Sequence, residues 1–308
     1  MIKVFIIYMS LSLSLFADNL FSPLPQSVEY DKDKALLGKK LYHDTRLSGD
    51  NTISCASCHD LSAGGVDGTP TSIGIDGQVG PINAPTVYNS SFNFVQFWDG
   101  RAKDLKEQAG GPVENPIEMG AKFSSVIERL LKDGDYKESF DALYGGEISK
   151  DTITDAIAEF EKALITPDSK FDRFLRGDSD ALNTLEKQGF TLFNSKGCVA
   201  CHNGVNLGGN LYQKAGIFDK FPQIEGAEFL GRYNLTKNER DRYFVKVPTL
   251  RNISKTAPYF HHGQTKDLLT AIFQMGYYQL GVALQVEEAR AIEAFLKALD
   301  GEVPEIAK

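Results

Sequence analysis

The chain has 308 residues, of which 42% are hydrophobic and 24% charged, and this ordinary balance excludes a disordered chain. We expect a globular protein with room for two modest domains. The formal net charge of −8, from 33 basic and 41 acidic residues, argues against nucleic acid as a partner. A basic or weakly charged partner fits the composition better.

The first 17 residues, MIKVFIIYMSLSLSLFA, predict an export signal peptide. One lysine precedes an apolar run that is short for a membrane span, and the segment ends on Ala17. Leu15 stands where signals prefer a small residue, so an uncleaved membrane anchor is the alternative. Removal of the segment, with Lys3, leaves 32 basic and 41 acidic residues, a formal charge of −9, in a mature chain that starts near Asp18.

An internal repeat is visible in two pairs of segments. ALLGKKLYHD (35–44) and EKQGFTLFNSKG (186–197) each contain Gly, two residues, Leu and an aromatic residue. AIAEFEKAL (156–164) and AIEAFLKAL (291–299) match at six of nine positions. The repeat predicts that each half of the chain follows one plan.

Both late segments predict helices with one apolar face. The apolar residues recur at helical spacing in each and are Ile157, Phe160 and Leu164 in the first and Ile292, Phe295 and Leu299 in the second. We expect Asp151 or Thr152 to cap the first of these helices and Pro167 to stop it.

The intervals between the predicted helices are long and show little β-type alternation. The segment 61–85 is rich in Gly, Asp, Asn and Pro, and such a loop in a compact domain needs an organiser. A large flat cofactor can fill that role. We therefore predict a mainly α fold of two cofactor domains, 18–170 and 171–308, with the last residues able to return to the first.

The four cysteines identify the cofactor, because they form two CxxC pairs that are each followed by histidine, CASCH (55–59) and CVACH (198–202). Two thiols three residues apart on a helical turn can form thioethers to haem vinyl groups, with the adjacent histidine under the iron. A zinc site would need four ligands in one cluster, and a thioredoxin-like pair would need a β-α-β pattern. We predict two covalently bound c-type haems, held by Cys55, Cys58 and His59 and by Cys198, Cys201 and His202.

The sixth iron ligands decide function, since an iron with two strong protein ligands passes electrons and an open one can bind peroxide. The candidates in the mature chain are Met119, Met275, His43, His261 and His262. We favour Met275 on the second haem, 73 residues after His202 (275 − 202), in a loop before the last helix. Core packing is the alternative for Met275. The three histidines have ordinary interpretations as packing or surface residues.

The motifs as a series resemble the bacterial di-haem cytochrome c peroxidases from about Ala35 to Leu299. In chain order they are CxxCH, TSIG, GPxNAPTVYN, FWDGRA, EQAGGPVENPIEMG, the second CxxCH, VPTLRNI, TAPYFHHG and MGYYQLG. The resemblance implies a periplasmic enzyme that reduces hydrogen peroxide to water with electrons from a small cytochrome c or cupredoxin. The haem on His202 and Met275 would be the electron entry site, and the haem on His59 the peroxidatic one. A homodimer is compatible with the sequence.

The resemblance also implies roles for residues that would otherwise be ordinary. Trp98, by default a core residue, matches a tryptophan that bridges the haems. Gln108 and Glu118 match a distal-pocket pair, and Pro112 a proline that shapes the same pocket. A carboxylate near the iron can take a proton from peroxide and return it to the leaving oxygen, although Glu118 alone would be interpreted as a solvated loop charge.

A calcium site between the domains is a further implication of the resemblance. Asn83, Thr256 and Pro258 match positions whose carbonyl oxygens hold the ion, a suitable donor type for calcium. His261 matches a histidine near the second haem, and we assign it no ligand role.

The stretch TSIGIDGQ (71–78) departs from the family pattern. Many of these peroxidases have a histidine after TSIG that caps the peroxidatic iron of the oxidised enzyme, and here the residue is Ile75. Isoleucine cannot bind iron, and Asp76 would be an unusual haem ligand. We predict an open first haem that needs no reductive activation.

Two other functions remain as alternatives. MauG-like oxidases of a protein substrate also lack the capping histidine, but they use a tyrosine on the second haem, for which Tyr277 and Tyr278 are the nearby candidates here. A plain di-haem electron carrier is the third interpretation. A carrier normally keeps six protein-ligated positions, so an open haem beside a glutamate argues against it.

Overall fold

The computed structural model describes residues 20–221 and 226–308, so the export signal predicted for residues 1–17 lies outside the described residues. The structure is mainly helical, as expected, with a single pair of short strands among the described residues. The helices and strands are α1 (Lys32–Tyr42), α2 (Cys55–Cys58), α3 (Leu105–Glu114), α4 (Phe123–Leu130), α5 (Gly134–Tyr144), α6 (Lys150–Ala163), α7 (Lys170–Leu175), α8 (Thr184–Ser195), β1 (Tyr212–Lys214), α9 (Tyr233–Thr236), β2 (Phe244–Lys246), α10 (Leu268–Gln274) and α11 (Val286–Lys297).

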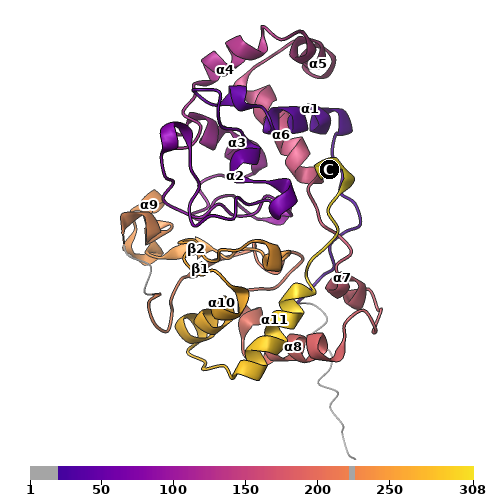
Figure 1. The fold of residues 1–308 in the computed structure, drawn as a ribbon, viewed down its shortest axis with the longest axis vertical. Coiled ribbons are helices and arrows are strands. Elements are labelled where there is room, and N and C mark those ends of the chain that lie inside the picture. The colour runs from indigo at the N-terminus through magenta and orange to yellow at the C-terminus, as the bar shows by residue number, and fades with distance from the viewer. Residues whose placement is uncertain (1–19, 222–225) are drawn as a thin grey trace, which may run out of the picture.

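The helices form two groups, with the two strands between them (Figure 1). Helices α1 to α6 make the upper group in that view, and α7, α8, α10 and α11 the lower one. Strand β1 pairs with β2 in antiparallel register, with Gln213 opposite Val245. None of the helices in the described part of the chain is long and apolar enough to cross a membrane.

The repeat in the sequence corresponds to one packing contact that occurs twice. In the upper group α1 crosses α6 at Gly38, where an added Cβ atom would lie 1.9 Å from the main-chain oxygen of Ala156. In the lower group α8 crosses α11 at Gly189, where the same atom would lie 1.9 Å from the oxygen of Ala291. Glycine is required at both positions because the helix backbones touch there. The predicted twofold plan is therefore present in the structure.

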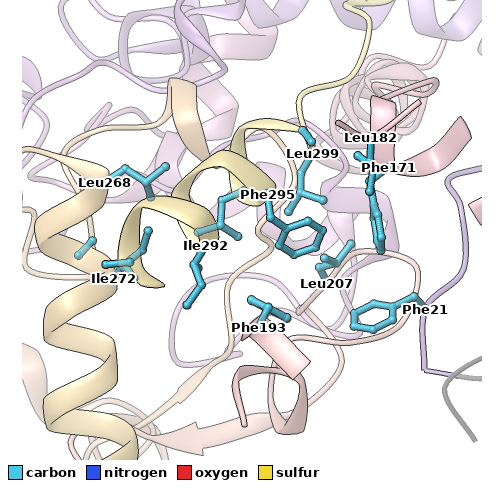
Figure 2. Packing of buried hydrophobic residues seen from close by; sticks show 14 of the residues in the cluster. Phe21, Phe171, Leu182, Phe193, Leu207, Leu268, Ile272, Ile292, Phe295 and Leu299 are labelled. Atoms are coloured by element: carbon cyan, nitrogen blue, oxygen red, sulfur yellow. The ribbon is translucent and has the colours of Figure 1, made fainter. Parts of the chain in front are cut away.

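The predicted apolar faces of the two late helices are buried. All six residues are at most 2% exposed, and they are Ile157, Phe160, Leu164, Ile292, Phe295 and Leu299. Figure 2 shows Phe295 packed among Phe193, Phe171 and Leu299 in the core of the lower group. These faces hold each helix against the core of its own half.

Helix α6 begins earlier than the sequence suggests. The prediction that Asp151 or Thr152 caps it is wrong, because the N-cap is Ser149, whose side chain accepts a hydrogen bond from the Thr152 amide. Thr152 occupies the reciprocal position of this capping box. The helix ends at Ala163, shortly before Pro167, as predicted.

Each end of the described chain packs against the helix group that the other half of the chain forms. Near the N-terminus, Phe21 lies in the core of the lower group, and the Leu24 amide donates to Asp172 Oδ1 over 2.9 Å. Near the C-terminus, Ile306 and Ala307 pack against the cluster of the upper group that contains Phe160. Each group is therefore completed by a segment from the far end of the chain.

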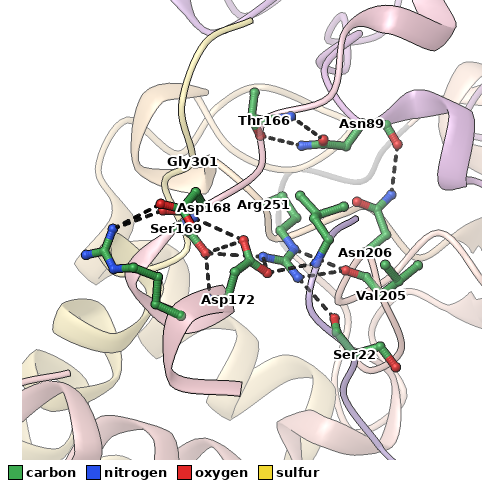
Figure 3. Close-up of polar contacts among 12 residues, drawn as sticks. Ser22, Asn89, Thr166, Asp168, Ser169, Asp172, Val205, Asn206, Arg251 and Gly301 are labelled. Atoms are coloured by element: carbon green, nitrogen blue, oxygen red, sulfur yellow. Dashed lines mark hydrogen bonds and ion pairs between the residues drawn. The ribbon is translucent and has the colours of Figure 1, made fainter. Parts of the chain in front are cut away.

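A buried polar network lies where the halves meet (Figure 3). Arg251 and Asp172, both fully buried side chains, form an ion pair of 2.7 Å, and the Arg251 guanidinium also donates to the main-chain oxygen of Ser22. Asn206 donates to the main-chain oxygen of Asn89 over 3.2 Å, which ties the second half to the first. Buried groups that satisfy one another in this way fix the relative position of the elements that carry them.

Candidate functional site: two cavities at the CxxCH motifs

The first CxxCH motif lines a cavity of about 280 Å³ in the upper half of the molecule. Cys55 and Cys58 lie on the single turn of α2, and His59 follows as its C-cap. The Tyr42 hydroxyl donates to the His59 main-chain oxygen over 2.6 Å, which fixes the end of the motif to α1. Cys55, Cys58 and His59 all face this cavity.

The wall of the first cavity also contains the residues expected from the distal-pocket motif. Gln108 and Pro112 come from α3, which Asp104 caps by accepting from the Glu107 amide. Glu118 follows α3 in a turn whose Asn115 side chain donates to Glu118 Oε1 over 2.7 Å. The structure thus brings Gln108, Pro112 and Glu118 to the cavity of His59.

The Glu118 carboxyl is partly desolvated. Burial raises its pKa above the ordinary value, while the nearby Arg101 guanidinium and the bond from Asn115 act in the opposite direction. A carboxyl with a raised pKa exchanges protons more readily near neutral pH than a solvated one.

Trp98 lies between the two cavities and lines both of them. Its indole Nε1 donates to the main-chain oxygen of Asn83 over 2.9 Å. The Asn83 amide in turn donates to the main-chain oxygen of His261 over 3.0 Å, and the His261 ring lies 5.8 Å from the indole between centroids. His261 and Val245 also line both cavities.

The second CxxCH motif lines a cavity of about 170 Å³ in the lower half. Cys198, Cys201 and His202 face it from one side, and Met275 is among the residues that line it. Met275 is not in a loop as expected from the sequence. It begins a π-helical turn, Met275–Gln279, that continues α10 without a break. Single π turns of this kind recur at functional sites.

The donor set of each motif suits a c-type haem. None of the four cysteines forms a disulfide, so both pairs of thiols are available for thioether bonds. His59 Nδ1 lies 3.3 Å from the Gly65 oxygen, and His202 Nδ1 lies 3.2 Å from the Leu207 oxygen. With Nδ1 donating to a carbonyl, Nε2 of each ring is left to bind a metal. Burial also lowers the pKa of both rings, to about 4 for His202, which favours the neutral form that a ligand needs.

Ile75 does not face the first cavity in this structure. Its amide donates to the Glu118 main-chain oxygen over 2.9 Å, and its Cδ1 lies 2.2 Å from where a Cβ atom on Gly120 would be. Ser72 and Gly74 from the same stretch do line the cavity. The position expected for a capping residue therefore packs against the turn that carries Glu118.

The remaining candidate ligands are at different depths. His43 is exposed at the end of α1, whereas His261 and His262 are buried beside the second cavity. Met119 is buried in the wall of the first cavity. Tyr277 is 48% exposed and Tyr278 packs on Phe221, and neither tyrosine lines the second cavity.

The expected calcium positions have oxygen donors of neutral charge. The main-chain oxygen of Asn83 accepts from Trp98 and keeps a second lone pair, and its Nδ2 donates to the Thr69 oxygen, so both oxygens of Asn83 could serve as donors. Pro258 is joined to Ala257 by a cis peptide bond, and Thr256 precedes this pair. Across residues 20–221 and 226–308 there is no group of three or more His, Cys, Asp or Glu side chains able to hold a metal ion.

Three residues of the cavity walls were missed by sequence reasoning. Arg101 lies in the first cavity wall and pairs with Asp99 over 3.0 Å. Glu161, 5% exposed in the same wall, has a pKa raised to about 8 by burial. Gln279 lines the second cavity. Arg101 belongs to the motif FWDGRA, which could have drawn attention to it. Glu161 is a charged residue in a helix, and the sequence pattern alone predicts that such a residue faces solvent.

Comparison with known proteins places the chain in a family. A family model described as di-haem cytochrome c peroxidase matches residues 32–180. The cytochrome c551 peroxidase of Nitrosomonas europaea is 49% identical over 94% of this chain and 86% of the relative. The chain therefore belongs to the di-haem cytochrome c peroxidase family. The protein is an enzyme of the cytochrome c peroxidase class. Membership of this family implies two c-type haems.

The chain is also similar to a second peroxidase and to one solved structure. The cytochrome c peroxidase Ccp of Escherichia coli is 52% identical over 91% of this chain, which spans 60% of the length of that relative. A crystal structure of a MauG-like protein associated with microbial copper homeostasis has a TM-score of 0.82 and 27% identity, covering 96% of this chain and 97% of the other. The fold is thus shared by peroxidases and MauG-like proteins.

Proposed function

We propose that the protein reduces hydrogen peroxide to water in the first cavity, with electrons that enter at the second cavity from a small cytochrome c or cupredoxin. The observation that carries the proposal is the presence of Glu118, Gln108 and Trp98 in the wall of the cavity that also contains His59. The overall reaction consumes one peroxide, two electrons and two protons and releases two waters.

A haem held by Cys55, Cys58 and His59 would supply the redox iron of the first cavity. The Glu118 carboxylate accepts a proton from one peroxide oxygen and delivers it to the other, so that the departing group is water. The Gln108 amide donates a hydrogen bond to the oxygen on which negative charge develops.

Electron entry is assigned to the second cavity. A haem held by Cys198, Cys201, His202 and Met275 would have the raised potential that histidine and methionine ligation gives. Trp98 lines both cavities and is the aromatic group through which electrons would pass to the first.

The absence of a histidine at position 75 leaves the first cavity open. Because Ile75 packs against Gly120 and cannot bind iron, the oxidised protein reacts with peroxide without prior reduction. We further propose export to the periplasm, directed by residues 1–17, and a calcium ion on oxygens of Asn83, Thr256 and Pro258.

A MauG-like oxidation of a protein substrate is the second candidate. The missing capping histidine and the similarity to a MauG-like structure favour it. Against it, Met275 lines the second cavity while Tyr277 and Tyr278 do not. A plain electron carrier is disfavoured because a cavity with a desolvated glutamate has no use in a carrier.

The test is rapid mixing of the oxidised, haem-loaded protein with hydrogen peroxide, followed at the Soret band and repeated after one-electron reduction. A fast change in the oxidised sample, then oxidation of an added reduced cytochrome c in proportion to peroxide, is the expected result. Reaction of the half-reduced sample alone would overturn the role of Ile75 and leave the peroxidase. Peroxide reaction without donor oxidation would overturn the peroxidase.

Glu118→Gln is the matched variant for this experiment. We expect its turnover to fall by roughly 10²- to 10⁴-fold, the usual contribution of a positioned acid–base group. Glu114→Gln is the control, because Glu114 lies on the outer face of α3 and pairs with Lys150. Equal rates in both variants would remove Glu118 from the reaction.

A further inference from the structure

The π turn that carries Met275 is tied to the end of β1 by a side chain. Gln279, the last residue of the turn, donates from Nε2 to the Lys214 oxygen over 3.0 Å. Its Oε1 accepts from the Gly216 amide over 2.9 Å. The donor and the acceptor of the Gln279 amide group therefore both bond to the same short segment of chain.

The same segment, residues 214–219, makes further contacts with the turn. The amides of Phe218 and Asp219 both donate to the Tyr278 oxygen, over 3.0 and 3.1 Å. The Phe218 ring covers Gly281, where an added Cβ atom would lie 2.5 Å from Cδ2 of the ring. We call residues 214–219 the strap.

The strap begins at the two-stranded sheet, which lies between the two cavities. Lys214 is the last residue of β1 and pairs with Phe244 on β2, the strand whose Val245 lines both cavities. The backbone contacts of the strap can form with any residue in the turn. The two Gln279 bonds, in contrast, need a side chain of that length with both a donor and an acceptor.

Met275 and Gln279 are the two ends of one turn and both line the second cavity. Two cations line it as well, Lys214 and Lys196, of which Lys196 pairs with Glu288 over 2.6 Å. A methionine thioether is a weak donor that a stronger ligand such as hydroxide displaces as the pH rises, so the methionine has to be held in place by the chain that bears it.

We propose that Gln279 is a positioning residue that keeps Met275 on the iron of the second haem by fixing the π turn to the strap. The inference rests on the assignment of Met275 in the proposed function. Loss of both amide bonds leaves the turn held to the strap by the backbone bonds to the Tyr278 oxygen, and this weaker attachment makes displacement of the sulfur easier.

The experiment follows the methionine-to-iron charge-transfer band of the oxidised, haem-loaded protein as a function of pH. In Gln279→Leu the pH at which half of the band is lost is expected to fall by about one unit, a tenfold change in the displacement equilibrium. Gln279→Glu keeps an acceptor for the Gly216 amide and is expected to lie between the wild type and Gln279→Leu. Carbon monoxide should bind to the reduced second haem least readily in the wild type, more readily in Gln279→Glu and most readily in Gln279→Leu.

Gln78→Leu is the matched control. Gln78 donates from Nε2 to the Pro116 oxygen over 2.9 Å in the other half, so its loss removes a similar bond without touching the second cavity. The same midpoint in Gln279→Leu and wild type would overturn the positioning role while leaving Met275 as the ligand. A wild-type protein without the band would overturn the Met275 assignment itself and the inference with it, while peroxide turnover would still test the peroxidase separately.

Discussion

The indole Nε1 of Trp98 donates to the main-chain oxygen of Asn83, and this 2.9 Å bond fixes the ring in the wall shared by the two cavities. The bond leaves the Asn83 backbone oxygen engaged and the ring unable to turn without losing a partner. The same loop is held from the second half through the bond between the Asn83 amide and the His261 oxygen.

Replacing Trp98 by Phe is therefore expected to slow electron transfer between the two cavities without closing either one. The aromatic volume is largely kept, but the bond to Asn83 is lost. In the reduced protein mixed with peroxide, oxidation of the second haem should lag behind that of the first. Simultaneous oxidation of both haems in the variant would contradict this role.

Arg101→Gln should move the acid side of the pH–rate profile to higher pH. The Arg101 guanidinium lowers the Glu118 pKa against the larger effect of burial, so its removal raises that pKa further. The carboxylate that accepts the proton then forms only at higher pH, and the rate at mildly acid pH falls. Lys103→Gln is the control, since Lys103 is an exposed cation two residues away. Identical shifts in the two variants would indicate a general effect of net charge.

Ile75→His is expected to convert the oxidised first haem from high-spin to low-spin. The histidine can reach the iron if the stretch 71–78 releases the bond between the residue 75 amide and the Glu118 oxygen. Optical and electron paramagnetic resonance spectra measure the change. The variant should also need one-electron reduction before it reacts with peroxide. A spectrum that remains high-spin would show that the stretch stays packed against Gly120.

Gly38→Ala and Gly189→Ala should destabilise the protein by similar amounts. In each case the new methyl group meets a helix backbone at 1.9 Å, and overpacking of this kind costs roughly 1–3 kcal/mol in the free energy of unfolding. Gly134→Ala is the matched control, because nothing lies within 4 Å of its added methyl group. Denaturant unfolding of the haem-loaded protein measures all three. Equal stability of Gly189→Ala and Gly134→Ala would contradict the repeated contact.

Glu161→Gln should stabilise the protein increasingly as the pH rises. Burial raises the folded-state pKa of Glu161 from 4.5 to about 8, so the folded state holds this proton more tightly than the unfolded state. Wild-type stability from this group is present at low pH and is lost between about pH 4.5 and 8, at up to ~1.4 kcal/mol per pH unit. The neutral amide has no such loss. Parallel stability curves for both proteins from pH 5 to 8 would show that Glu161 does not titrate in this way.

The covalent motifs and the repeat could be predicted from sequence because they are local. Cys55 to His59 is a contiguous motif, and the Gly38 and Gly189 positions recur with their aromatic neighbours at fixed spacing. The Ser149 cap was missed because Asp151 and Thr152 are equally good caps by residue type, and the backbone geometry decides among them. The Gln279 contacts could not be predicted, since their partners lie 63 and 65 residues away and are backbone atoms without a sequence signature.

The exchange of chain ends described above also affects how the molecule is assembled. Phe21 belongs to the core of the half that is synthesised last and Leu24 is bonded to it, while Ile306 and Ala307 complete the half that is synthesised first. Neither half has its full set of contacts until the whole chain is present, and separating the halves at the midpoint would strip a piece from each. The relative position of the two CxxCH cavities therefore depends on both ends of the chain as well as on the polar contacts between the halves. A chain that has lost either end is expected to hold its two cavities less firmly in relation to each other.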